Sequence, residues 1–252
     1  MLLIAIDTSG RHGSVALCRG EQGSFETMEL VPLEGGTYSA RLMPTIAELL
    51  ARQRITKEQV DAFVVVSGPG SFTGLRVGIS TAKGLAEVLG KPLVAVTMLE
   101  AVALAQSVGR DALEALKGHG LSHTESEPSN AALAAEGIIT VALDAGRGEV
   151  YVGDFTLEHS HARCIRQYVS KLDSFASGAA SHKSRVLTPD SRVADALQAT
   201  GADVQQVAPV RADDIGRLGL AKLLAGDVSD PETLDASYIR RSDAEIFGPP
   251  KR

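Results

Sequence analysis

Short apolar runs alternate with amphipathic segments along the first hundred residues. The valines at residues 64–66, like the aliphatic residues at 2–6, are typical of strands buried on both faces of a sheet. Apolar positions three and four residues apart, as in residues 73–89, indicate helices. The full pattern predicts strands at residues 2–6, 14–18, 26–31, 63–66 and 93–96, and helices at residues 37–52, 56–59, 73–89 and 99–106. This order of elements predicts an α/β domain built around a mixed sheet.

A polar stretch interrupts this alternation before it resumes. Residues 118–130 contain Gly, Ser, His and Glu and predict a surface insertion next to a domain boundary. Beyond them the pattern predicts strands at residues 138–143, 149–157, 185–187 and 204–207, helices at residues 192–199 and 211–226, and an extended tail. We therefore expect one lobe at residues 1–106 and a second at 107–252. Whether the last long helix, at about 211–226, packs back on the first lobe stays open.

Two predicted hairpins carry polar residues at their tips. The first tip is Asp7-Thr8-Ser9-Gly10, and the second is the turn that begins at Asp144. Strand, Asp-containing turn and strand recur in both halves, which suggests that one topology is repeated. Acidic and hydroxyl groups at such a tip resemble the phosphate-binding hairpin of the actin, sugar-kinase and Hsp70 superfamily, whereas the alternative is a solvated turn. A candidate nucleotide site therefore consists of Asp7, Thr8, Ser9 and Asp144.

The glycine-rich turn SGPGSFTG at residues 67–74 has two interpretations. Backbone N–H groups at the start of the following helix could hold an anion. The stretch matches neither GxxxxGK[ST] nor a GxGxxG after a first strand, so both nucleotide fingerprints are missing. The alternative is that Gly74, Gly78 and Ala82 leave clearance for a partner helix. Ser71 and Thr73 fit helix caps better than nucleophiles, because the G-x-S-x-G elbow is absent.

Composition narrows the function classes. A net charge of −6 argues against autonomous, tight binding to nucleic acid, so a role around RNA would need a basic partner. The two cysteines lack CxxC spacing, which disfavours a zinc site or a disulfide framework. No stretch reads as a membrane span or a secretion signal, so we expect a cytoplasmic protein without membrane contact.

Three motifs resemble the TsaB (YeaZ) family of bacterial tRNA-modification proteins: IAIDTS at residues 4–9, SGPGSFTGLRVGISTAKGLA at 67–86 and LDAGRGEVYVGDF at 143–155. The resemblance implies a two-lobed actin-like ATPase (ribonuclease H-like) fold, each lobe a mixed sheet flanked by helices. It also implies a non-catalytic subunit of the machinery that makes N6-threonylcarbamoyladenosine at position 37 of tRNA. TsaD would be its partner, TsaE would join a larger complex, and tRNA would be reached only through that complex. A homodimer stays open, and so does a nucleotide at a shared interface, with no cofactor firmly implied.

The resemblance places the pairing surface on the two helices of the first lobe. The expected interface residues are Tyr38, Arg41, Leu42 and Thr45 on the first helix and Thr73, Gly74, Leu75, Arg76, Gly78, Ile79 and Ala82 on the second.

A pair of metal-binding histidines found in TsaD-like proteins is missing from the corresponding positions of this chain. TsaD-like proteins carry an H-x-x-x-H pair after the strand that here ends at Val96, and Met98 and Val102 stand in those places, where they cannot replace histidine as metal ligands. This disfavours a metallopeptidase. His119 and His123 share that spacing, but they lie in the polar insertion, where a common helical face is not assured. The remaining alternative is an actin-like small-molecule kinase or ATPase that acts alone.

Overall fold

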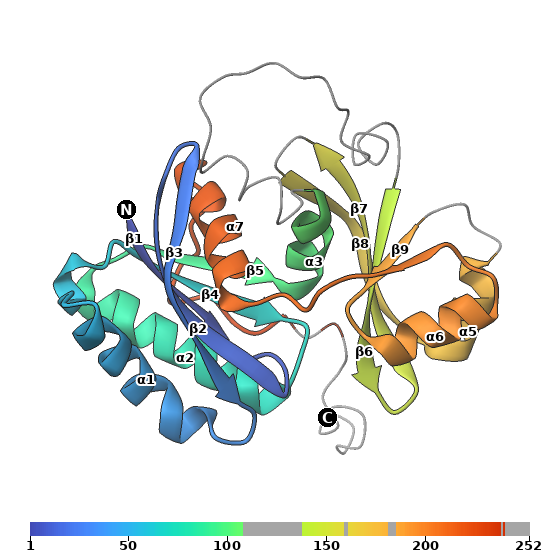
Figure 1. Ribbon diagram of the computed structural model, residues 1–252, viewed down its shortest axis with the longest axis horizontal. Coiled ribbons are helices and arrows are strands. Elements are labelled where there is room, and N and C mark those ends of the chain that lie inside the picture. The colour runs from blue at the N-terminus through green and yellow to red at the C-terminus, as the bar shows by residue number, and fades with distance from the viewer. Residues whose placement is uncertain (108–137, 159–160, 181–184, 238, 240–252) are drawn as a thin grey trace, which may run out of the picture. The chain divides into compact units, whose positions relative to one another are not determined.

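The computed structural model describes residues 1–107, 138–158, 161–180, 185–237 and 239 (Figure 1). The predicted insertion at residues 118–130, with His119 and His123, lies outside these ranges. The chain forms two compact units, of which the first comprises Met1–Met98 together with Val210–Arg252 and the second Leu99–Pro209. The expected boundary is near residue 106, whereas the chain passes from the first unit to the second after Met98. The chain then returns to the first unit after Pro209.

The first unit is built on a five-stranded mixed sheet. Its strands are β1 (Leu2–Asp7), β2 (His12–Glu21), β3 (Ser24–Glu34), β4 (Ala62–Gly68) and β5 (Leu93–Thr97), in the spatial order β3-β2-β1-β4-β5. The three N-terminal strands form an antiparallel meander, while β4 and β5 run parallel to β1. Because β1 and β4 lie at the centre with helices on both faces, their residues are apolar with hardly any alternation.

Helices cover both faces of this sheet (Figure 1). The helices α1 (Tyr38–Arg52) and α2 (Phe72–Leu89) lie on one face, and α7 (Ala212–Leu224) lies on the other. A short 3₁₀ helix, η1 (Lys57–Gln59), precedes β4, and the Gln59 side chain accepts a hydrogen bond from the Thr56 N–H, as in a capping box. Among the described helices, none is both long and apolar enough to cross a membrane.

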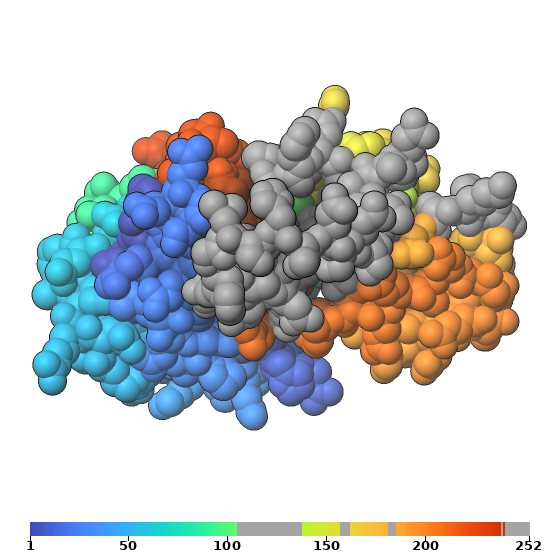
Figure 2. All heavy atoms as spheres, turned by 45° about the horizontal axis from the view of Figure 1, so that its top comes forward, coloured from blue at the N-terminus to red at the C-terminus, as the bar shows by residue number. Residues whose placement is uncertain are grey.

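Two glycines let α7 approach the sheet closely. A Cβ atom on Gly219 would lie 2.5 Å from one methyl carbon of Val64 and closer still to the other, and one on Gly216 would lie 3.0 Å from the Cys18 sulfur. In Figure 2 the orange-red atoms of α7 lie directly against the blue atoms of the first strands. A helix encoded after the second unit therefore completes the core of the first.

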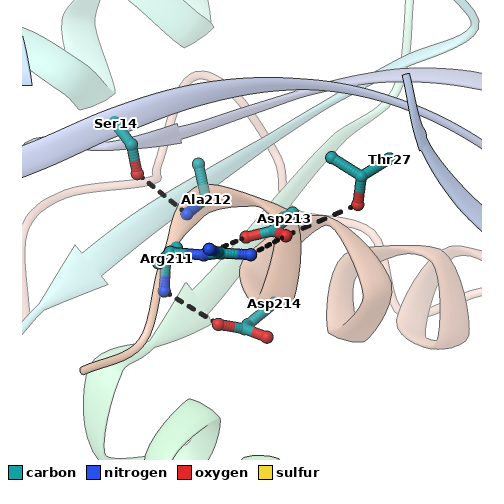
Figure 3. Close-up of polar contacts among 6 residues, drawn as sticks. All are labelled: Ser14, Thr27, Arg211, Ala212, Asp213 and Asp214. Atoms are coloured by element: carbon teal, nitrogen blue, oxygen red, sulfur yellow. Dashed lines mark hydrogen bonds and ion pairs between the residues drawn. The ribbon is translucent and has the colours of Figure 1, made fainter. Parts of the chain in front are cut away.

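Polar contacts hold the start of α7 in place (Figure 3). The Ala212 N–H donates to Ser14 Oγ of β2 at 2.9 Å, and the Arg211 N–H donates to the Asp214 carboxylate at 2.9 Å. The Arg211 guanidinium forms a two-bond ion pair with Asp213, at 3.0 and 2.6 Å. These bonds satisfy N-terminal N–H groups of the helix and place carboxylates near its positive end.

The second unit repeats the topology of the first. Its strands are β6 (Ile138–Gly146), β7 (Glu149–Glu158), β8 (His161–Lys171), β9 (Val186–Thr188) and β10 (Val204–Gln206), in the order β10-β9-β6-β7-β8. Here too an antiparallel meander, β6-β7-β8, is extended by two parallel strands. The repeated topology that the two hairpins suggested is therefore confirmed.

The helices of the second unit follow the same plan. A helix α5 (Leu172–Ala179) lies between the meander and β9, and α6 (Ser191–Ala199) lies between β9 and β10, as α1 and α2 do in the first unit. A further helix, α3 (Met98–Ser107), links β5 to this unit. The sequence pattern missed β8 and α5. We attribute this to the polar sequence HARCIRQYVSK of β8, an edge strand, and to the Ser and Gly residues in the eight-residue α5.

We predict opposite effects of adding one methyl group at two glycines of the first unit. Gly219→Ala should lower the free energy of unfolding by roughly 1–3 kcal/mol, because Val64 sits in a central strand and cannot move away. Gly84→Ala, on an open part of α2, should raise it by up to about 1 kcal/mol, because alanine favours the helix. Urea unfolding of both variants checks this, and equal effects would contradict the close packing of α7.

Candidate functional site

The glycine-rich turn joins β4 to α2 and fixes where the helix begins. The Ser71 hydroxyl accepts a hydrogen bond from the Gly74 N–H at 3.3 Å, so Ser71 is the predicted helix cap. Gly68 has a φ of +133°, which residues with a side chain rarely adopt. At the other end, Gly90 has a φ of +62° and closes α2.

The small residues of α2 face the chain's own sheet. The Thr8 hydroxyl donates a 2.8 Å hydrogen bond to the Gly74 carbonyl. A Cβ atom on Gly74 would collide with the Thr8 carbonyl oxygen, and one on Gly78 would collide with Thr8 Oγ1. The expectation that Gly74, Gly78 and Ala82 leave clearance for a partner helix is therefore wrong. Because Thr8 fills that space, the strip is part of the internal packing.

The first hairpin tip is closed by the same packing. Asp7, Thr8 and Ser9 are only 3%, 1% and 7% exposed. The Ser9 N–H and hydroxyl both donate to Asp7 Oδ1, at 2.9 and 2.7 Å. The Ser9 carbonyl accepts a 2.6 Å bond from the Ser71 N–H. In this structure the polar groups expected to bind phosphate are thus used within the chain.

Burial changes the acid–base properties of this region. Desolvation raises the pKa of the Asp7 carboxyl above its usual value, although the hydrogen bonds from Ser9 act in the opposite direction. Desolvation, with a smaller effect from Asp7, raises the pKa of the Tyr38 hydroxyl to about 12. The Tyr38 hydroxyl donates to the Gly10 carbonyl at 2.8 Å, so it also ties α1 to the hairpin tip.

Asp144 occupies the equivalent place in the second unit, but its surroundings differ. Its side chain is about one third exposed and lies 3.3 Å from the Arg192 guanidinium. Its N–H donates to the Asp190 carboxylate at 2.8 Å, and Asp144 Oδ1 accepts from the Gly146 N–H at 2.9 Å. Asp7 and Asp144 belong to different units, so the predicted nucleotide site, which needs both, remains a prediction.

The expected interface residues divide by exposure. Arg41, Thr73 and Arg76 are exposed on α1 and α2. The others are buried within the first unit: Tyr38, Leu42, Thr45, Gly74, Leu75, Gly78, Ile79 and Ala82. Buried side chains cannot contact a partner unless the unit opens, so a surface on these helices must use their outer faces.

The outer faces of α1 and α2 carry exposed apolar residues that the sequence pattern did not single out. Met43, Phe72 and Val88 are 47%, 42% and 81% exposed. On α1 the exposed residues also include Ala40, Pro44, Ala47 and Ala51, which share one side of the helix at spacings of three and four. The sequence contained a sign of this second apolar side, because these residues of α1 do not coincide with the inward positions Leu42, Ile46 and Leu49. We call the exposed set on α1 together with Phe72, Thr73, Arg76 and Val88 of α2 the outer helix face.

The described ranges hold no cluster of three or more His, Cys, Asp or Glu side chains that could bind a metal ion. Met98 begins α3 and Val102 is fully buried in it.

Comparison with known proteins finds partial matches to proteins named for tRNA modification. The TsaD family, described as tRNA N6-adenosine threonylcarbamoyltransferase, matches residues 34–116. A TsaB protein of Haemophilus influenzae, named as a tRNA threonylcarbamoyladenosine biosynthesis protein, is 41% identical over 42% of this chain and 43% of its own length. The TsaB protein of Bacillus subtilis is 31% identical over 61% of this chain and 54% of its own length. Over the matched parts, the chain is similar to TsaB proteins.

The chain spans about half the length of the curated relatives that it matches. The matches include a tRNA N6-adenosine threonylcarbamoyltransferase of Solidesulfovibrio magneticus, 34% identical over 60% of this chain and 44% of that protein. TsaB and TsaD proteins are thus both related to this chain in sequence.

Solved structures extend the likeness to the whole fold. YeaZ from Pseudomonas aeruginosa superposes with a TM-score of 0.65 at 23% identity, covering 94% of this chain and all of that one. A second structure, of a Pseudomonas aeruginosa protein similar to YeaZ, gives a TM-score of 0.68. The expected fold class, with two mixed sheets flanked by helices, is confirmed.

We predict that Asp7→Asn stabilises the protein more at neutral than at acidic pH. A carboxyl whose pKa is raised on folding holds its proton more tightly in the folded state, so its contribution to stability falls as pH rises above its unfolded pKa. Asparagine has no such dependence, and its amide oxygen can still accept from Ser9. Urea unfolding of variant and wild type between pH 4 and 8 checks this. Asp195→Asn, at an exposed carboxylate of α6, is the control, and a stability difference for Asp7→Asn that does not change with pH would contradict the prediction.

Proposed function

We propose that this protein is a non-catalytic subunit of the machinery that makes N6-threonylcarbamoyladenosine in tRNA, and that it supports a TsaD protein by binding it through the outer helix face. The observation that carries the proposal is the exposure of Met43, Phe72 and Val88 on two adjacent helices of a TsaB-family fold. Large apolar side chains left exposed to water are a typical feature of interaction sites.

The chemistry of the outer helix face suits docking of a second helical element. Small side chains at Ala40, Ala47 and Ala51 allow another helix to come close, while Met43 supplies adaptable apolar contact. The Arg76 guanidinium lies 4.0 Å from the centre of the Phe72 ring, so a cation and an aromatic ring share one end of the surface. Arg and aromatic residues are enriched where interfaces bind tightly.

The first hairpin supports a role without catalysis. A kinase or ATPase of this fold needs the hairpin tip open to phosphate, whereas Thr8 and Ser9 are bound to α2 and to the β4–α2 turn. The alternative of an enzyme that acts alone therefore has no observation in its favour. We further propose that the complex assembles in the cytoplasm, that TsaE joins it, and that tRNA is contacted through the complex.

We predict that Ala47→Glu weakens binding to TsaD at least tenfold, which corresponds to about 1.4 kcal/mol of binding free energy. Ala47 is exposed at the middle of α1, so glutamate leaves the folded chain intact but puts a charge into the docking face. Calorimetry with purified TsaD measures the affinity. The content of the modified nucleoside in tRNA, in cells depleted of the native protein and complemented with each variant, reports function.

Ala199→Glu is the matched control, because it makes the same change at an exposed alanine of α6 in the second unit. If wild type, Ala47→Glu and Ala199→Glu bind TsaD with equal affinity, the proposed surface is contradicted. Self-association that Ala47→Glu abolishes, with no binding to TsaD, would instead identify a homodimer. Gly78→Leu and Leu75→Asp are unsuitable here, because both residues are buried and their replacement would disturb folding.

A further inference from the structure

The segment that follows α7, residues 227–237, runs along the edge of the first sheet, and we call it the C-terminal strap. It begins by pairing with β5, the edge strand of that sheet. The Ser229 N–H donates to the Leu93 carbonyl at 2.7 Å, and the Ser229 hydroxyl accepts from the Ala95 N–H at 3.0 Å. Ser229 thus satisfies edge groups that would otherwise face solvent or another chain.

The strap then passes α2. A turn at Asp230 is held by the Glu232 N–H and the Thr233 hydroxyl, both of which donate to the Asp230 carboxylate. The Lys83 ammonium of α2 donates to the Leu234 carbonyl at 2.9 Å. A charged donor on the helix therefore binds the backbone of the strap directly.

The strap ends at the glycine-rich turn. The Ser237 N–H donates to the Ser67 carbonyl at 2.6 Å, and Ala236 is only 8% exposed. A Cβ atom on Gly68 would lie 2.7 Å from the Ser237 carbonyl oxygen, so the strap and the turn are in close contact. On its other side the turn contacts Ser9, because the Ser71 N–H donates to the Ser9 carbonyl. The start of α2 is thus held between the first hairpin and the C-terminal strap.

We infer that the C-terminal strap is a positioning element for the partner surface: it holds the β4–α2 turn and so fixes how Phe72, Thr73 and Arg76 are presented. This inference rests on the proposed function, because those residues belong to the outer helix face. The strap contacts the turn and the strap-facing side chain Lys83, and it acts on the partner only through them. A TsaD protein would therefore bind more weakly when the strap is detached, although none of the proposed contact residues is changed.

The test compares two substitutions at one residue. Ser237→Pro removes the N–H that donates to Ser67, whereas Ser237→Ala keeps it and loses only the hydroxyl. Ser237→Pro should speed amide hydrogen exchange at Ser71 and Gly74 by about tenfold or more, with no change at Leu49 of α1, because only the local opening becomes easier. It should also weaken binding to TsaD by roughly tenfold, a loss of about 1.4 kcal/mol. Ser237→Ala should behave as wild type in both measurements.

Lys83→Met gives a second route if Ser237→Pro does not fold. It keeps the aliphatic stem and removes the donor to Leu234, and Lys57→Met is its control at an exposed lysine of the same unit. Lys83→Arg keeps a charged donor, so exchange at Ser71 and Gly74 should be as slow as in wild type. If the strap contributed only to overall stability, these substitutions would change amide exchange across the whole first unit.

The two proposals fail separately. Unchanged exchange at Ser71 and Gly74 in both Ser237→Pro and Lys83→Met would overturn the inference, whatever the protein binds. Faster exchange at those amides with unchanged affinity for TsaD would also overturn it. If wild type shows no affinity for TsaD, the proposed function falls, and with it the role of the strap in presenting a partner surface. The exchange data would then report only its effect on α2.

Discussion

The close contact between Thr8 and the first turns of α2 is the constraint on which the first unit depends. Because Gly74 and Gly78 have no side chains, the helix lies directly on the end of β1, and the Thr8 hydroxyl reaches the Gly74 carbonyl. The same contact closes the first hairpin tip and orients α2 so that Arg76 and Phe72 face outward. The hairpin tip at Thr8 and the glycines at the start of α2 have residue types that would suit a phosphate site, but here they fix the position of α2.

The C-terminal part of the chain completes this arrangement. Helix α7 covers the face of the sheet opposite α1 and α2, and the C-terminal strap pairs with β5 before it reaches the glycine-rich turn. Contacts between residues this far apart in sequence form at a high cost in chain entropy. The first unit therefore reaches its final packing only after the second unit has been made.

The two units share a topology but differ in chemistry at equivalent places. Asp7 is buried and bonded to Ser9, whereas Asp144 is partly exposed and paired with Arg192. In the first unit two long helices, α1 and α2, cover one face of the sheet, whereas the corresponding α5 and α6 have eight and nine residues. The longer helices α1 and α2 carry the outer helix face through which we propose that the protein binds TsaD.

The sequence by itself determined the elements of the first unit, the helix caps and the repeated hairpin, because hydrophobic spacing, Ser71, Gly90 and the Asp-containing turns act over a few residues. It could not find the polar edge strand β8, whose residues have no buried face to impose alternation. It also misassigned the strip at Gly74, Gly78 and Ala82. A strip of small residues on a helix can be recognised in the sequence, but the tertiary packing decides which neighbouring group fills the space beside it. Here Thr8 of the same chain fills it, so the surface proposed to bind a partner uses other residues of α1 and α2, and exposure rather than residue type marks Met43, Phe72 and Val88 among them.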